Sequence, residues 1–199
     1  MRVLITGANG FIGRELAQLL HLHAFEVRGA IRSVDRLSHP QKGCEYICVG
    51  DLSNATDWKK SLESIDVVIH LAARAHMIHE PGESTLHLFR KVNVDATLHL
   101  AQEAMKYGVK RFIYLSSIGV NGTFNTKPFT ELDIPSPTQN YAISKFEAEQ
   151  GLQKLALSEM EVVIIRPPLV YGPNAPGNFS RLMYWMHKNV PLPLGSIHN

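Results

Sequence analysis

Residues 2–13 read RVLITGANGFIG, a short apolar run that leads directly into a glycine-rich turn. The run predicts a β-strand, and the apolar residues that recur at helical spacing after it predict a helix with one apolar face. Gly7 allows a sharp turn, Gly10 lets a phosphate approach the backbone, and Gly13 lets the helix lie close to the sheet. Phosphates also bind to the free N–H groups at a helix N-terminus. The stretch therefore predicts a dinucleotide site that includes Gly7, Asn9, Gly10, Phe11, Ile12 and Gly13.

The rest of the chain alternates between strand-like and helix-like segments. Further strands are expected over residues 25–31, 43–49, 66–71, 110–117 and 161–166. Further helices are expected around Trp58 and Leu62, over residues 83–107 and over residues 141–158. Six alternations without a repeat predict a doubly wound α/β fold, a Rossmann fold with a parallel sheet. We expect an NAD(P)-binding domain over residues 1–170 and the truncated start of a substrate-binding region over residues 171–199.

The composition is ordinary for a soluble globular protein, with 199 residues, 45% hydrophobic and 19% charged, and a net charge of +2. This small charge argues against nucleic acid as a partner, and no apolar run is long enough to cross a membrane. Cys44 and Cys48 are interpreted as reduced thiols of a cytoplasmic protein. His76 and His79 have no carboxylate or thiolate neighbours at a recurring spacing, so no metal site is expected.

The carboxyl ends of the predicted strands are where a doubly wound sheet binds its ligands. Arg32 follows the second strand, where a carboxylate would usually hold the ribose 2′-hydroxyl of NAD. An arginine suits the 2′-phosphate of NADP instead, so Arg32 favours NADP slightly over NAD. Asp35 lies close enough in the sequence to leave NAD open. Stacking on the adenine and exposure to solvent are alternative roles for Arg32.

Two more strand ends supply candidate cofactor contacts. Asp51 can hydrogen-bond the adenine edge and Leu52 can pack on its face. Small side chains follow the fourth strand, where the cofactor must pass close to the backbone. The candidate contacts there are Leu71, Ala72 and Ala73.

Ser117, Tyr141 and Lys145 form a candidate catalytic set. Ser117 ends the fifth strand, and the other two are four residues apart and share one face of a predicted helix. A phenol with a pKa near 10 is a poor base, but a nearby ammonium favours the phenolate and lowers that pKa. Tyr141 can then exchange a proton with a substrate hydroxyl during hydride transfer, while Ser117 holds the same oxygen. Lys145 would also reach the nicotinamide ribose.

The ordered motifs resemble those of the extended short-chain dehydrogenase/reductases, the NAD(P)-dependent epimerases, dehydratases and reductases of nucleotide sugars. The motifs are TGANGFIG at 6–13, DL at 51–52, HLAA at 70–73, SS at 116–117, YAISK at 141–145 and RPPLVYGP at 166–173. The resemblance implies catalytic roles for Ser117, Tyr141 and Lys145. It also implies that Asn93 helps to organise the site and that the backbone after Pro167, including Pro168, approaches the nicotinamide.

Within that family, the chain looks most similar to bacterial proteins of surface-polysaccharide biosynthesis. The resemblance implies hydride transfer at C4 of a UDP-sugar, as in a UDP-glucose 4-epimerase. It implies that Asn178 contacts the nucleotide diphosphate. Arg181 is close by on the same predicted helix, where it would meet a phosphate or equally well stay in solvent. Members often dimerise through the helix near Asn93 and the helix that carries Tyr141, so a homodimer is possible.

Three other functions stay open. An NADPH-dependent 4-keto-sugar-nucleotide reductase is favoured by Arg32 and by Asn121, which stands where epimerase-like members often carry a tyrosine. A dehydratase would need an acid–base pair just after Ser117, and the next two residues offer none. A non-catalytic NADP-sensing regulator would commonly have lost the catalytic tyrosine or lysine, and both are present.

Overall fold

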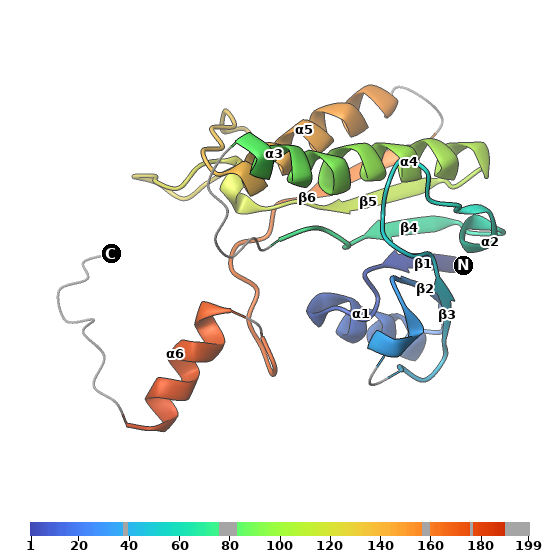
Figure 1. Ribbon diagram of the computed structural model, residues 1–199, viewed down its shortest axis with the longest axis horizontal. Helices are drawn as coiled ribbons and strands as arrows, with labels where there is room; N and C mark the ends of the chain where they lie inside the picture. The colour runs from blue at the N-terminus through green and yellow to red at the C-terminus, as the bar shows by residue number, and fades with distance from the viewer. Residues whose placement is uncertain (38–39, 76–82, 157–159, 176, 190–199) are drawn as a thin grey trace. The chain divides into compact units, whose positions relative to one another are not determined.

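Within residues 1–37, 40–75, 83–156, 160–175 and 177–189, which the computed structural model describes, six strands form one parallel sheet (Figure 1). Their order across the sheet is β3-β2-β1-β4-β5-β6, and every neighbouring pair is parallel. The strands are β1 (Arg2–Thr6), β2 (Glu26–Ile31), β3 (Cys44–Cys48), β4 (Val67–His70), β5 (Arg111–Leu115) and β6 (Glu161–Ile165). The predicted doubly wound fold is confirmed, with the order reversing between β1 and β4.

Helices cover both faces of this sheet (Figure 1). One face packs against α1 (Phe11–Leu22), and the other packs against α4 (Ala96–Lys106) and α5 (Asn140–Leu155). The shorter elements of this part of the chain are α2 (Lys59–Leu62), α3 (Glu83–Arg90) and the 3-10 turns η1 (Val34–Arg36) and η3 (Ile118–Val120).

The two faces carry separate apolar cores because side chains alternate along a strand. On β1, Val3 and Ile5 pack with Ala17 of α1, whereas Leu4 packs on the opposite face with Leu100 of α4. Each of these side chains is at most 2% exposed. Burial on both faces explains why the central strands are almost continuously apolar.

The predicted helix over residues 83–107 is interrupted by a π-helical turn, η2 (Lys91–Asp95), which joins α3 to α4. The predicted end of this segment is as expected: Gly108 has a φ of +72° and donates its N–H to the carbonyl of Met105. The π turn matters for the site because it contains Asn93, and π turns are frequent at functional sites.

The chain divides into two compact units, Met1–Pro168 and Leu169–Asn199. The first contains the whole sheet. In the second, α6 (Asn178–His187) follows Gly177, and the rings of Tyr171 and Phe179 lie 5.3 Å apart. The assignment of the second unit to substrate binding stays a prediction.

Candidate cofactor and active site

The glycine-rich turn is shaped so that side chains are excluded from it. Gly7 has a φ of +67°, and a Cβ there would stand 3.0 Å from the backbone nitrogen of Ala72. A Cβ on Gly13 would stand 2.8 Å from Cα of Ala8, so an alanine would push α1 away from β1. Gly10 caps α1 without a side-chain hydrogen bond, which leaves the first N–H groups of the helix to a ligand. These features fit a bound pyrophosphate.

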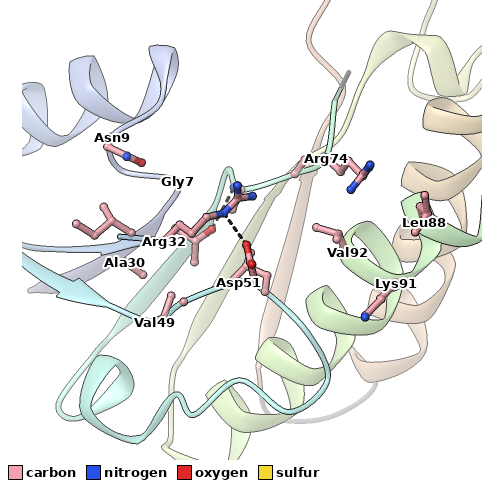
Figure 2. A pocket seen from close by; sticks show the side chains of 16 residues that line it. Gly7, Asn9, Ala30, Arg32, Val49, Asp51, Arg74, Leu88, Lys91 and Val92 are labelled. Atoms are coloured by element: carbon pink, nitrogen blue, oxygen red, sulfur yellow. Dashed lines mark hydrogen bonds and ion pairs between the residues drawn. The ribbon is translucent and has the colours of Figure 1, made fainter. Parts of the chain in front are cut away.

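A cavity of about 610 Å³ lies beyond the ends of β1, β2, β3 and β4 (Figure 2). Of the predicted cofactor residues, it is lined by Gly7, Asn9, Arg32, Asp51, Leu52, Ala72 and Ala73. The others do not line it, namely Gly10, Phe11, Ile12, Gly13, Leu71, Tyr141, Lys145 and Pro168. The strand ends chosen from the sequence therefore converge on one hollow.

Helical residues that the sequence analysis missed form the opposite wall of the cavity. They are Leu88 of α3 and Lys91 and Val92 of η2, and Arg74 of the loop after β4 lies beside them (Figure 2). The sequence predicted a helix here, but it did not predict that this helix faces the cofactor cavity. Strand-end position identified the rest of the site and could have found Arg74, which follows HLAA directly.

Arg32 and Asp51 form an ion pair at the strand-end side of the cavity, with Nε of Arg32 2.8 Å from Oδ1 of Asp51 (Figure 2). The two side chains are 57% and 84% exposed, so the pair is weak and a phosphate can compete for the guanidinium. From the sequence, these residues were expected to act separately, on the ribose and on the adenine. Because β2 and β3 are neighbours, their ends bring the two charges together.

A buried hydrogen-bond chain supports the cavity from within the sheet. His70 contacts the hydroxyl of Thr6 through Nδ1 at 2.7 Å and that of Thr97 through Nε2 at 2.9 Å. Thr6 in turn accepts a hydrogen bond from the backbone N–H of Ala72, which lines the cavity. Burial and, less strongly, the nearby positive charge of Lys145 together lower the pKa of His70 to about 3, so the ring is neutral at physiological pH.

Asn93 connects the loop after β4 to α5. Its side chain is 1% exposed. Its Oδ1 accepts the N–H of Arg74, and its Nδ2 donates to the carbonyl of Arg74 and to Oγ of Ser144. Ser144 donates in turn to the carbonyl of Tyr141. These contacts give Asn93 a clear way to organise the surroundings of the candidate catalytic residues.

The candidate catalytic residues come from the end of β5 and the start of α5. Ser117 caps η3, and its hydroxyl accepts the N–H of Gly119 at 3.2 Å. Gly119 lies against α5, since a Cβ there would stand 3.4 Å from Cβ of Ala142. The residue before Ala142 is Tyr141, whose ring meets that of Phe89 edge-on at 6.2 Å. Gly119 of η3 therefore packs on the first turn of α5, which carries Tyr141, and a shared site of Ser117 and Tyr141 stays a prediction.

The pKa of Tyr141 differs from the expectation. The spacing of Tyr141 and Lys145 predicted that the ammonium lowers this pKa, but burial raises the pKa of Tyr141 above its ordinary value of 10. Burial penalises the charged phenolate, and this effect dominates in the structure. Burial also lowers the pKa of Lys145 to about 7, although the carboxylate of Glu149 opposes that shift.

Asn121 belongs to a buried polar network behind the site. Its Oδ1 accepts from Arg166 at 3.1 Å and its Nδ2 donates to the carbonyl of Thr130 at 3.3 Å. Arg166 forms an ion pair of 2.6 Å with Glu149, whose side chain is 1% exposed. Asn121 therefore links the loop between η3 and α5 to Arg166, which follows β6. Arg166 extends this link to Glu149 of α5. These contacts explain Asn121 without reference to a substrate, so it no longer argues for a reductase.

The remaining candidates belong to the second unit or lie outside the described residues. In the second unit, the guanidinium carbon of Arg181 lies 5.7 Å from the ring centroid of Trp185, and the side chain of Asn178 is not described. His76 and His79 also lie outside the described residues. Where the chain is described, no group of three or more His, Cys, Asp or Glu side chains could hold a metal, and no helix is long and apolar enough to span a membrane.

Comparison with known proteins adds a family to this geometry. Residues 3–192 match the sequence model of the NAD dependent epimerase/dehydratase family. The UDP-glucose 4-epimerase of Vibrio cholerae is 43% identical over 199 residues, which cover 98% of this chain and 60% of that protein. The chain therefore spans less than two thirds of the length of this relative.

Solved structures agree with the sequence comparison. UDP-glucuronic acid 4-epimerase from Bacillus cereus in complex with NAD has a TM-score of 0.81 at 28% identity, over 96% of this chain and 65% of that one. MoeE5 in complex with UDP-glucose and NAD has a TM-score of 0.82 at 31% identity, over 96% of this chain and 63% of that one. Both share the fold described here.

Proposed function

Because the chain belongs to the NAD-dependent epimerase/dehydratase family, we propose that it carries out hydride transfer at C4 of a UDP-sugar as a 4-epimerase. The observation that carries this proposal is the 43% identity to a UDP-glucose 4-epimerase across nearly the whole chain. The nicotinamide cofactor we propose is NAD, which the structural relatives contain. Polysaccharide biosynthesis in the cytoplasm is the setting that this activity would fit.

In this proposal, the first unit binds the cofactor through backbone and strand-end groups. The N–H groups at the start of α1 bind the pyrophosphate, because their positive dipole end faces an anion there. Arg32, Asp51 and Leu52 surround the adenosine at the ends of β2 and β3. When bound, NAD supplies a hydride acceptor and, later, a hydride donor.

The side chains of η3 and α5 handle the proton of the sugar hydroxyl. Tyr141 takes this proton as hydride leaves C4, and returns it to the same oxygen when hydride comes back to the other face. Ser117 donates a hydrogen bond to that oxygen and holds it in place. Only the phenolate of Tyr141 can accept this proton, and since burial raises the pKa of Tyr141, the phenolate depends on the positive charge of Lys145 to form near neutral pH.

Sugar interconversion by wild type and by Tyr141→Phe tests the proposal. UDP-glucose and UDP-galactose are separated by chromatography, and absorbance at the nicotinamide band is followed in parallel. We expect interconversion without net cofactor change, and a loss of at least about 100-fold in rate for Tyr141→Phe. Tyr107→Phe is the matched control, because it removes a phenol hydroxyl from the exposed end of α4. Full activity of Tyr141→Phe would show that the catalytic assignment is wrong.

An NADPH-dependent 4-keto-sugar-nucleotide reductase is the second candidate, and Arg32 alone favours it. Asp51 counts against it, because its carboxylate, 2.8 Å from Nε of Arg32, would repel a 2′-phosphate beside the same guanidinium. Calorimetry with ADP-ribose and its 2′-phosphate separates the two. We expect wild type to prefer ADP-ribose, and Asp51→Asn to gain about tenfold in affinity for the 2′-phosphate. A tenfold preference of wild type for the 2′-phosphate would favour the reductase.

A homodimer remains part of the proposal. The helices expected to meet in the dimer are the one near Asn93 and α5. Within one chain, Arg90 of α3 and Glu147 of α5 already form a partly exposed ion pair of 2.5 Å. Light scattering on the purified chain measures the mass directly. A monomer at micromolar concentration would remove dimerisation from the proposal without touching the assigned chemistry.

A further inference from the structure

Tyr114 lies directly beneath the candidate catalytic lysine. Its side chain is fully buried in β5, and Nζ of Lys145 stands 4.1 Å from the centroid of its ring. Lys145 reaches this position from α5 and is itself 1% exposed. A cation within about 6 Å of an aromatic face is attracted by the negative face of the ring, most strongly where water is excluded.

Two groups near Lys145 favour its charged form, the carboxylate of Glu149 and the ring of Tyr114. Glu149 is the nearby carboxylate on the same helix, but it forms its ion pair with Arg166. Among the described residues, Lys145 takes part in no ion pair. Tyr141, on the turn of α5 before Lys145, has a raised pKa and is therefore a neutral phenol.

The ring of Tyr114 is itself held rigidly. The ring of His70 stacks on it at 5.8 Å with an interplanar angle of 18°, and the hydroxyls of Thr6 and Thr97 fix His70 from both sides. His70 is neutral, so it does not compete with the ammonium for the ring. Burial also raises the pKa of Tyr114 well above 10, so its ring is that of a neutral phenol.

We propose that Tyr114 is a positioning residue whose ring face holds the ammonium of Lys145 in its buried place beside Tyr141. The ring favours the charged form of Lys145, against the desolvation that burial imposes. The role of Lys145 in turnover rests on the proposed function, but the contact with the ring does not. The hydroxyl of Tyr114 has no part in the proposal.

The pKa of Lys145 in the purified chain is the decisive measurement. It is read from a ¹³Cε NMR titration of lysine-labelled protein, with the Lys145 signal assigned by its absence in Lys145→Arg. Tyr114→Leu removes the ring, and we expect the midpoint, about 7 in wild type, to fall by about one pH unit. Tyr114→Phe keeps the ring, and we expect its midpoint to stay within about 0.3 unit of wild type.

Phe112→Leu is the matched control for a loosened core. Phe112 is fully buried two residues earlier on β5, lies on the same face, and also contacts His70, with 5.9 Å between ring centroids. We expect it to lower the melting temperature without moving the Lys145 midpoint. If Tyr114→Leu does not fold, 3,4,5-trifluorophenylalanine at position 114 replaces it, because fluorination weakens the negative ring face and keeps the shape.

Three results would overturn the proposal. The first is a midpoint that does not move when the ring is removed or fluorinated. The second is an equal shift in Tyr114→Phe, which would assign the effect to the hydroxyl. The third is an equal shift in Phe112→Leu, which would assign it to general loosening of the core. Because no turnover is measured, these results stand apart from the loss or survival of epimerase activity.

Discussion

Lys145, His70 and Tyr141 are three titratable side chains around α5 whose pKa values follow from burial. The two basic groups have lowered pKa values and the phenol has a raised one, as desolvation of a charged form requires. The sequence predicted that Tyr141 and Lys145 share a helix face. It could not predict these directions, because they depend on side chains of β4 and β5 that pack beneath α5.

At the residue scale, His70 should make the protein sensitive to acid. The unfolded chain protonates this ring near pH 6.5, whereas the folded chain holds it neutral down to about pH 3. Between these values the unfolded state binds more protons, so the free energy of unfolding falls as pH falls. From pH 7 to pH 5 this contribution amounts to about 2 kcal/mol.

The measurement is urea unfolding at pH 7 and pH 5 for wild type and for His70→Gln, whose amide takes up no proton. We expect the variant to lose about 2 kcal/mol less than wild type between the two pH values. His23→Gln is the control, because His23 is exposed at the end of α1. Equal acid sensitivity in wild type and His70→Gln would show that His70 is not buried in its neutral form.

At the scale of elements, the strands and glycine turns were predictable, but the π turn was not. An apolar run of the right length and a turn residue are local signals, and they predicted each strand to within about two residues. A π turn inserts one extra residue without changing composition, so the segment over residues 83–107 still appeared as one helix. The neighbouring ends of β2 and β3 likewise brought Arg32 and Asp51 together, and only the sheet order shows that.

The contacts of Asn93 predict a specific loss of stability. Asn93→Ala leaves the N–H and carbonyl of Arg74 and the hydroxyl of Ser144 without these hydrogen bonds in a buried place. We expect it to cost about 1–3 kcal/mol in the free energy of unfolding, measured in urea. Asn54→Ala is the control, because Asn54 is exposed, and it should change stability by no more than about 0.5 kcal/mol. An Asn93→Ala variant as stable as the control would mean that the link between β4 and α5 contributes nothing.

At the scale of the whole molecule, the cofactor cavity belongs entirely to the first unit. All of its lining residues come from Thr6 to Val92, and the first unit extends to Pro168. We therefore expect a protein of residues 1–168 to bind ADP-ribose within about threefold of the affinity of the full chain, measured by calorimetry. At 100 times the dissociation constant, ADP-ribose should raise the free energy of unfolding of both by about 2.7 kcal/mol.

Gly13→Ala provides the control in the same shortened protein, because its Cβ would displace α1 from the glycine turn and weaken binding at least about tenfold. A tenfold weaker affinity of the unmutated residues 1–168 would instead show that Leu169–Asn199 contributes to the cofactor site. The two outcomes are separable, since the alanine acts through the turn at the end of β1 and the shortening acts beyond β6. Retained ADP-ribose binding together with lost turnover of UDP-sugars would assign the second unit to the substrate.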